Sequence, residues 1–142
     1  MKSQIPLPVN FTEKFALFND QWTPKVIAQM NDYQFKLVRL QGEFIWHEHT
    51  KTDETFIVLE GSLVIDFEES SLTLNAGEMV VVPKGCLHRP RAETEAKLLL
   101  VEPVGVVNTG DAQSALDCTA RSVVIARCVF WLPLRTDKCL TF

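Results

Sequence analysis

The sequence lacks the features of a membrane, secreted or nucleic-acid-binding protein. No apolar run approaches the roughly 20 residues that a membrane-spanning helix needs, and residues 1–6 contain no apolar signal-peptide core. Positive charge is scarce too, because 14 Lys and Arg stand against 18 Asp and Glu, for a net charge of −4. A nucleic-acid surface needs a basic stripe. We therefore expect no nucleic-acid partner, no membrane partner and a cytoplasmic location.

Paired cysteines are also missing. The sequence has four cysteines and no CxxC pair, and three of the four lie after residue 116. Spacing of this kind favours free thiols in a reducing compartment over a disulfide framework or a zinc site. A chain of 142 residues with 46% hydrophobic content is long enough to bury a core without such cross-links. The cysteines are Cys86, Cys118, Cys128 and Cys139.

What the sequence has in quantity is short β-prone segments separated by turn residues. Asn31-Asp32 is typical of a hairpin turn, and Gln41-Gly42 indicates a bulge or bend. Eight or nine such segments with little helix predict an all-β fold, an antiparallel jelly-roll β-barrel or double-stranded β-helix. The expected strands include residues 26–30, 33–40, 55–59, 63–67, 72–74, 79–82 and 97–102, besides the segment around residues 46–49.

The ends of the chain differ from this central part. Asn10 is placed to cap a short N-terminal helix with phenylalanines at helical spacing, which we expect to pack outside the barrel. We divide the chain into an arm, short helix and first strand (residues 1–34), a barrel (35–105) and a tail (106–142). The apolar tail after residue 116 has two interpretations: a shifted reading frame or cloning artefact, or an extra strand covering the sheet or a dimer partner.

All three histidines of the chain lie between residues 47 and 88. Residues two apart on a strand face the same side, so His47 and His49 are expected to present neighbouring imidazoles. Glu54 follows a polar turn and is expected to fold back beside them, with Asp53 as the competing ligand. His88 comes from a separate strand. We interpret His47, His49, Glu54 and His88 as one metal site, since imidazole and carboxylate suit a single divalent transition ion.

The first half of this pattern resembles the first motif of the cupin superfamily. That motif consists of a glycine, the HxH pair, a glutamate and a second glycine, found here as Gly42, His47, His49, Glu54 and Gly61. The interval between Gly42 and His47 is one residue shorter than the family usually has. The resemblance implies a small barrel with a metal ion near one open end.

The second half resembles the second cupin motif, in which glycine, Pro-x-Gly and histidine follow at fixed intervals. Gly77, Pro83, Gly85 and His88 match it at every position, whereas Ala92 stands where the family often has asparagine. The wider sequence is similar to small single-domain cupins labelled mannose-6-phosphate-isomerase-like, a label that describes likeness rather than activity.

The surroundings of the ligands predict an apolar pocket. Phe56 and Val58 share the parity of Glu54 and are expected to line it; Cys86 shares that of His88 and either approaches the metal or fills the core. Arg39 is a candidate anchor for an anion if its strand continues unbroken through Gly42.

Two classes of function follow. The first is an enzyme acting on a small polar metabolite by metal-dependent oxygenation or isomerisation; the second is a non-catalytic binding or sensing protein. The ion could be Fe, Mn, Ni, Cu or Zn. The sequence offers no spare histidine as acid or base, which favours oxygenation or binding over isomerisation. Edge strands of such sheets are often covered by a second subunit, so we expect a homodimer.

Overall fold

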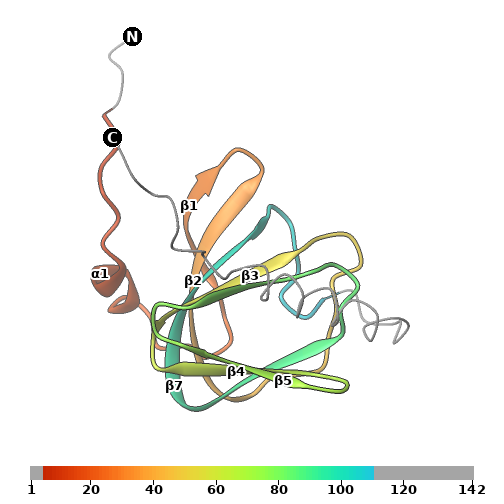
Figure 1. Ribbon diagram of the computed structural model, residues 1–142. Helices are drawn as coiled ribbons and strands as arrows, with labels where there is room; N and C mark the ends of the chain where they lie inside the picture. Colours follow the sequence, from red (N-terminus) through yellow and green to blue (C-terminus); the bar gives the residue numbers. More distant parts are fainter. Residues whose placement is uncertain (1–4, 111–142) are drawn as a thin grey trace, which may run out of the picture.

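The computed structural model describes residues 5–110, which form one short helix and seven strands (Figure 1). The expected tail after residue 116 and three of the cysteines lie outside the described residues. The all-β antiparallel jelly-roll prediction is confirmed. The elements are α1 (Phe11–Phe15), β1 (Lys25–Met30), β2 (Tyr33–Glu43), β3 (Glu54–Glu60), β4 (Ser62–Phe67), β5 (Ser71–Asn75), β6 (Met79–Val82) and β7 (His88–Pro103).

The long strand β7 organises the sheet. On one side it pairs with β2, from Tyr33↔Pro103 to Glu43↔Arg91. On the other side its first residues pair with β4 and its later residues with β3. Strands β6, β3, β7, β2 and β1 therefore follow one another through hydrogen bonds, while β4 and β5 turn away and close the bowl (Figure 1).

The hairpin and bulge predictions are confirmed. Asn31 takes a positive φ of 53° in the β1–β2 turn, a conformation that asparagine tolerates better than most residues. The β2–β7 register shifts between Leu40 and Gly42, and Gly42 has a φ of 83°. This bulge lies just before the segment that carries the first two histidines, so it sets the direction in which that segment leaves the sheet.

Two details of the strand assignment are corrected. The expected strand at residues 97–102 is the second half of β7, which begins at His88 and passes through Pro90, and the described residues contain seven strands rather than eight or nine. Residues 44–50 are extended but form no regular strand, and only His47 makes a bridge, with His88. Loss of the ladder after the Gly42 bulge explains the second difference.

Alternation along the strands separates two apolar clusters. Inward side chains such as Val38, Leu40 and Leu100 fill the bowl. Outward side chains Leu37 and Leu99 pack against Phe15 of α1, whose N-terminus is capped as predicted by a hydrogen bond from Glu13 N to Asn10 Oδ1 (3.1 Å). The helix therefore covers the outside of the sheet and leaves the interior to the site. Within residues 5–110 no helix has the length and apolar character needed to cross a membrane.

Candidate metal centre

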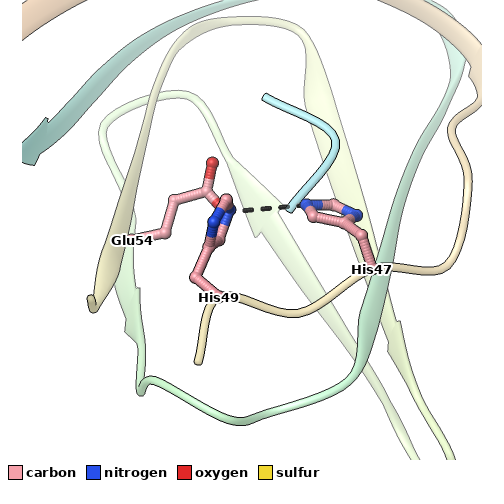
Figure 2. Close-up of side chains that lie close together, drawn as sticks. All are labelled: His47, His49 and Glu54. Carbon is pink, nitrogen blue, oxygen red and sulfur yellow. Dashed lines mark ion pairs between the residues drawn. The ribbon is translucent and has the colours of Figure 1, made fainter. Parts of the chain in front are cut away.

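The three histidines and Glu54 come together inside the bowl, near one end. His47 and His88 are joined by two reciprocal backbone hydrogen bonds, from His47 N to His88 O (3.0 Å) and from His88 N to His47 O (2.9 Å). Glu54 is the first residue of β3, as predicted, and His88 the first of β7. Figure 2 shows His47 and His49 on one passage of chain facing Glu54 on the neighbouring strand.

Glu54 Oε2 is the point on which the imidazoles converge. The Nε2 atoms of His88, His49 and His47 lie 3.2, 3.3 and 3.8 Å from this oxygen. Candidate ligand atoms of His47, His49 and Glu54 all lie within 4.8 Å of one another. His88 falls outside that compact set, but it contacts the same oxygen, and its ring lies tilted against that of His47 at 4.3 Å between centroids. The structure thus brings all four predicted residues to one place.

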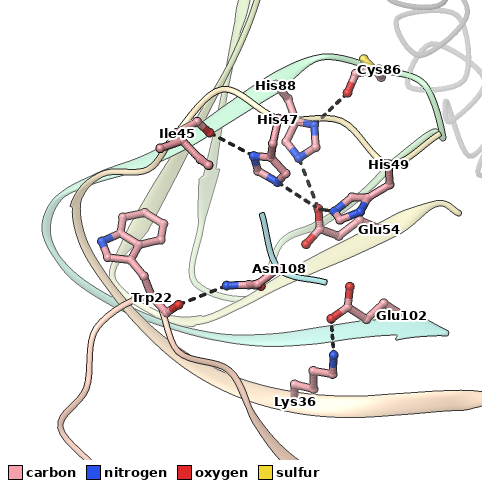
Figure 3. Close-up of polar contacts among 10 residues, drawn as sticks. All are labelled: Trp22, Lys36, Ile45, His47, His49, Glu54, Cys86, His88, Glu102 and Asn108. Atoms are coloured by element: carbon pink, nitrogen blue, oxygen red, sulfur yellow. Dashed lines mark hydrogen bonds and ion pairs between the residues drawn. The ribbon is translucent and has the colours of Figure 1, made fainter. Parts of the chain in front are cut away.

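Backbone carbonyls orient two of the rings. His47 Nδ1 lies 3.0 Å from Ile45 O, and His88 Nδ1 lies 2.8 Å from Cys86 O (Figure 3). A carbonyl can only accept, so Nδ1 carries a hydrogen in each ring, which leaves Nε2 as the ring atom that can bind an ion through its lone pair. Such outer contacts fix the tautomer that a metal ligand needs. The Nε2 atoms directed at Glu54 are therefore the ones that can coordinate an ion.

The electrostatics of Glu54 favour the ionised form. Burial by itself raises the pKa of this carboxyl, but hydrogen bonds from His47, His49 and His88 outweigh it and hold the pKa well below its usual range. All four side chains are buried. Burying an unpaired carboxylate is costly, so a carboxylate surrounded by three imidazoles is well matched to a cation. The nitrogen and oxygen donors suit a divalent transition ion without selecting one.

The predicted pocket residues form an apolar wall around the cluster. Phe56 makes an edge-to-face contact with the His88 ring at 6.0 Å between centroids, and Val58 is buried further along the same strand. Cys86 is fully buried in the core and meets His88 through its carbonyl; its sulfur is not part of the ligand cluster found among the described residues. The core-filling interpretation of Cys86 therefore describes its position.

A small cavity adjoins the cluster and is covered by the end of the described chain. It measures about 20 Å³, which holds about one water molecule. Its lining includes His47, Glu54, Phe56, Leu100 and Asn108. The Asn108 side chain donates from Nδ2 to Trp22 O (3.1 Å) and so ties residues 104–110 across the mouth of the bowl (Figure 3).

Two sequence candidates lie elsewhere. The hypothesis that Arg39 lines the pocket is wrong, because Val38 and Leu40 take the inward positions of β2. Arg39 points outward, where its guanidinium pairs with Glu95 Oε1 (2.6 Å) and donates to the carbonyls of Phe15 and Phe18. Asp53, the competing ligand, is exposed and accepts a hydrogen bond from Lys84 N (2.9 Å).

An ion pair that was not predicted from the sequence lies inside the bowl. Lys36 Nζ lies 2.6 Å from Glu102 Oε1, and both residues are buried (Figure 3). Burial raises the pKa of Glu102, while the hydrogen bond from Lys36 opposes that effect. The signal was present in the alternation, since Lys36 shares the inward parity of Val38 and Glu102 that of Leu100. Charged side chains normally point to solvent, which concealed the pair.

Comparisons with known proteins identify the family to which this fold belongs. The family model described as Cupin domain matches residues 36–102. A cupin-2 domain containing protein from Shewanella frigidimarina, of known crystal structure, is 59% identical, with a TM-score of 0.66, covering 67% of this chain and 93% of that one. A protein of known structure from Neisseria meningitidis is 37% identical, with a TM-score of 0.63 and coverage of 68% and 99%. The Bacillus subtilis protein YdbB is 36% identical, and the match covers 72% of this chain and 85% of that protein.

Proposed function

Because this chain belongs to the cupin superfamily, we propose that it is a metal-binding cupin that takes a small polar metabolite into its bowl. The observation that carries the proposal is the convergence of three buried imidazole Nε2 atoms on one Glu54 oxygen. One ion at that point would be held by His47, His49, Glu54 and His88. Its identity, among Fe, Mn, Ni, Cu and Zn, is a matter for measurement.

The residues around the cluster define what they can do for a ligand. Phe56 and its apolar neighbours exclude water from one side of the imidazoles. The carbonyls of Ile45 and Cys86 hold two rings in the ligating tautomer. A bound divalent ion would supply Lewis acidity, or a place for oxygen and metabolite to meet. Oxygenation and isomerisation of the metabolite are the two reactions consistent with this setting.

Metal analysis tests the proposal. Purified full-length protein should contain about one equivalent of a transition metal by mass spectrometry, and His47→Ala or His88→Ala should lose most of it, because ligand loss opens a four-donor site. Glu54→Gln should also lower occupancy. Glu60→Gln, at the exposed far end of the same strand, is the matched control and should retain the metal. Full occupancy in both histidine variants would refute the site.

The buried Lys36–Glu102 pair favours catalysis over simple binding, since it places two proton-carrying groups inside the bowl. It also restores isomerisation as a candidate, which the lack of a spare histidine had disfavoured. The alternative is a non-catalytic binding or sensing cupin. Screening metal-loaded protein against small hydroxy and keto acids, with and without oxygen, separates the two: oxygen uptake indicates oxygenation, rearranged product indicates isomerisation, and binding without turnover indicates a sensor.

We also propose that the protein forms a homodimer in the cytoplasm. Among the described strands β1 pairs only with β2, so its other edge is open. Val26, Met30 and Tyr33 are exposed on this hairpin, and an open, apolar edge is a common site of association. Light scattering after size exclusion should give twice the chain mass of 16.1 kDa, and Val26→Lys should shift the mass toward that of one chain.

A further inference from the structure

The Lys36–Glu102 pair lies in the same interior as the metal cluster, one layer away from it. The β3–β7 register pairs Phe56 with Leu100 and Thr55 with Val101. Extending this ladder by one step would put Glu54 opposite Glu102, and both residues share the inward parity. Directly opposed residues of an antiparallel pair have Cβ atoms about 5 Å apart. The carboxylate of Glu102 is therefore a neighbour of the ligating carboxylate.

Lys36 reaches this position from the other side of β7. The β2–β7 register places Gln34 opposite Glu102 and Lys36 opposite Leu100, so the pair is diagonal across the ladder. Lys36 Nζ holds Glu102 Oε1 at 2.6 Å. Figure 3 shows Glu102 between Lys36 and the cluster, with its second oxygen on the side toward Glu54.

That second oxygen is the feature that points to a ligand. Glu102 is 1% exposed, and its Oε2 atom has no hydrogen-bond partner within residues 5–110. A buried acceptor that stays unpaired destabilises the fold, and such atoms are rare enough in proteins to need a reason. An O–H donor from a bound molecule would satisfy this oxygen.

Charge narrows the class of molecule. A divalent ion brings two positive charges and Lys36 one, while Glu54 and Glu102 each bring one negative charge. With neutral imidazoles, one positive charge remains. A ligand with a single negative charge balances it inside a poorly solvated bowl, where uncompensated charge is costly. A dianionic phosphate would leave the interior negative, and a neutral ligand would leave it positive.

We propose that Glu102, held by Lys36, is the second contact point of the ligand site, accepting a hydrogen bond from a hydroxyl of a small, singly charged oxygen chelator. This rests on the proposed function, because the other end of the ligand occupies the metal. The ligand class is a hydroxylated α-hydroxy or α-keto carboxylate. Such a molecule exceeds the 20 Å³ cavity, whose lining includes Glu54 but not Glu102. Binding therefore requires the Asn108 side chain, which donates one hydrogen bond to Trp22 O, to move aside.

Two acids that differ by one hydroxyl test the contact. Glycerate and lactate are both singly charged α-hydroxy acids, and glycerate has the additional hydroxyl. Each is titrated by calorimetry into metal-loaded, full-length protein whose metal content has been measured beforehand. We expect glycerate to bind about tenfold more tightly than lactate, because a hydrogen bond to a charged group contributes about that factor.

Paired replacements locate the contact. Lys36→Met with Glu102→Leu removes the inner pair without leaving a lone buried charge. Lys97→Met with Glu60→Leu removes a less buried pair of the same two residue types, joined at 2.7 Å between β7 and β3. The tenfold preference for glycerate should disappear in the inner variant and persist in the outer one. If the inner variant does not fold, Glu102→Gln replaces it and should reduce the preference several-fold.

The outcomes separate the inference from the function beneath it. A wild-type protein that holds no metal refutes the proposed function. A metal-loaded wild type that binds neither acid, or both equally, overturns the role of Glu102 and leaves the metal site standing. A glycerate preference that survives in the inner variant also overturns it.

Discussion

Of the ion pairs that join β2 to β7, two lie on opposite faces of the same sheet. Lys36–Glu102 lies inside the bowl and Arg39–Glu95 outside, and each has an N–O distance of 2.6 Å. The side chain of Glu102 is 1% exposed and that of Glu95 36%. The two ion pairs therefore differ in their contribution to stability although their distances are equal. The inner charges have lost their hydration, and the outer ones have kept part of it.

The remaining hydrogen-bond partners differ as well. Arg39 also donates to the carbonyls of Phe15 and Phe18, and Gln21 donates to the second oxygen of Glu95 (2.7 Å). The outer pair thus also docks the N-terminal segment on the barrel. The inner pair leaves one oxygen of Glu102 facing the metal cluster. Ion pairing alone therefore does not identify a functional pair. The functional pair is the one that is buried and has an oxygen without a hydrogen-bond partner among residues 5–110.

The largest expected effect is that of removing one inner partner. Lys36→Met leaves the Glu102 charge buried without its cation, which should lower the free energy of unfolding by about 3 kcal/mol or more. Adding Glu102→Leu should recover most of the loss, because it removes the stranded charge. Urea unfolding monitored by circular dichroism measures both. If Lys36→Met lowers the free energy of unfolding no more than Glu95→Gln does, the proposed difference between the two pairs is wrong.

Arg39→Met should have the next largest effect. It removes two hydrogen bonds that anchor the N-terminal segment and one to Glu95, at about 1–2 kcal/mol in total after allowance for solvent. Metal content should not change, since Arg39 faces away from the bowl. Glu95→Gln keeps the carbonyl contacts of Arg39 and should cost less than half as much. Loss of metal in Arg39→Met would contradict its assignment to the outer face.

A third network, also outside the bowl, predicts a dependence on pH. Hydrogen bonds from Arg91, and then from Ser71 and Arg89, outweigh burial and hold the pKa of Asp66 well below its usual range. The folded pKa lies below the unfolded value of about 3.9, so this stabilisation is present above that pH and is lost as the pH falls.

Asp66→Asn tests that network. At pH 7 it should lower the free energy of unfolding by about 1 kcal/mol, since Arg89 and Arg91 are partly exposed. The gap between wild type and variant should narrow between about pH 4 and pH 2. Thermal unfolding at several pH values provides the measurement, and a gap that stays constant over this range would exclude Asp66 as its source.

The inner and outer faces also differ in how far the sequence predicts them. The four ligands follow from their spacing and from the cupin motifs, because the HxH pair and the separated histidine have few other arrangements in a small barrel. Arg39 was assigned to the wrong face, because the face on which its side chain lies depends on how β2 pairs with β7, and the sequence does not show that pairing. Lys36 and Glu102 were not predicted to lie inside, because charged residues are expected at the surface even where the alternation of the strand places them inward. The length of β7 was missed because Pro90 suggests a break, although β4 pairs with it there.

Anomalous diffraction from crystals grown with the native metal tests the metal centre most directly. One peak should appear among the imidazoles, with three nitrogens at about 2.0–2.2 Å, from Nε2 of His47, His49 and His88, and an oxygen of Glu54. The Nδ1 atoms of His47 and His88 should keep their bonds to the carbonyls of Ile45 and Cys86. A peak outside the bowl, or one ligated through Nδ1, would contradict the assignment.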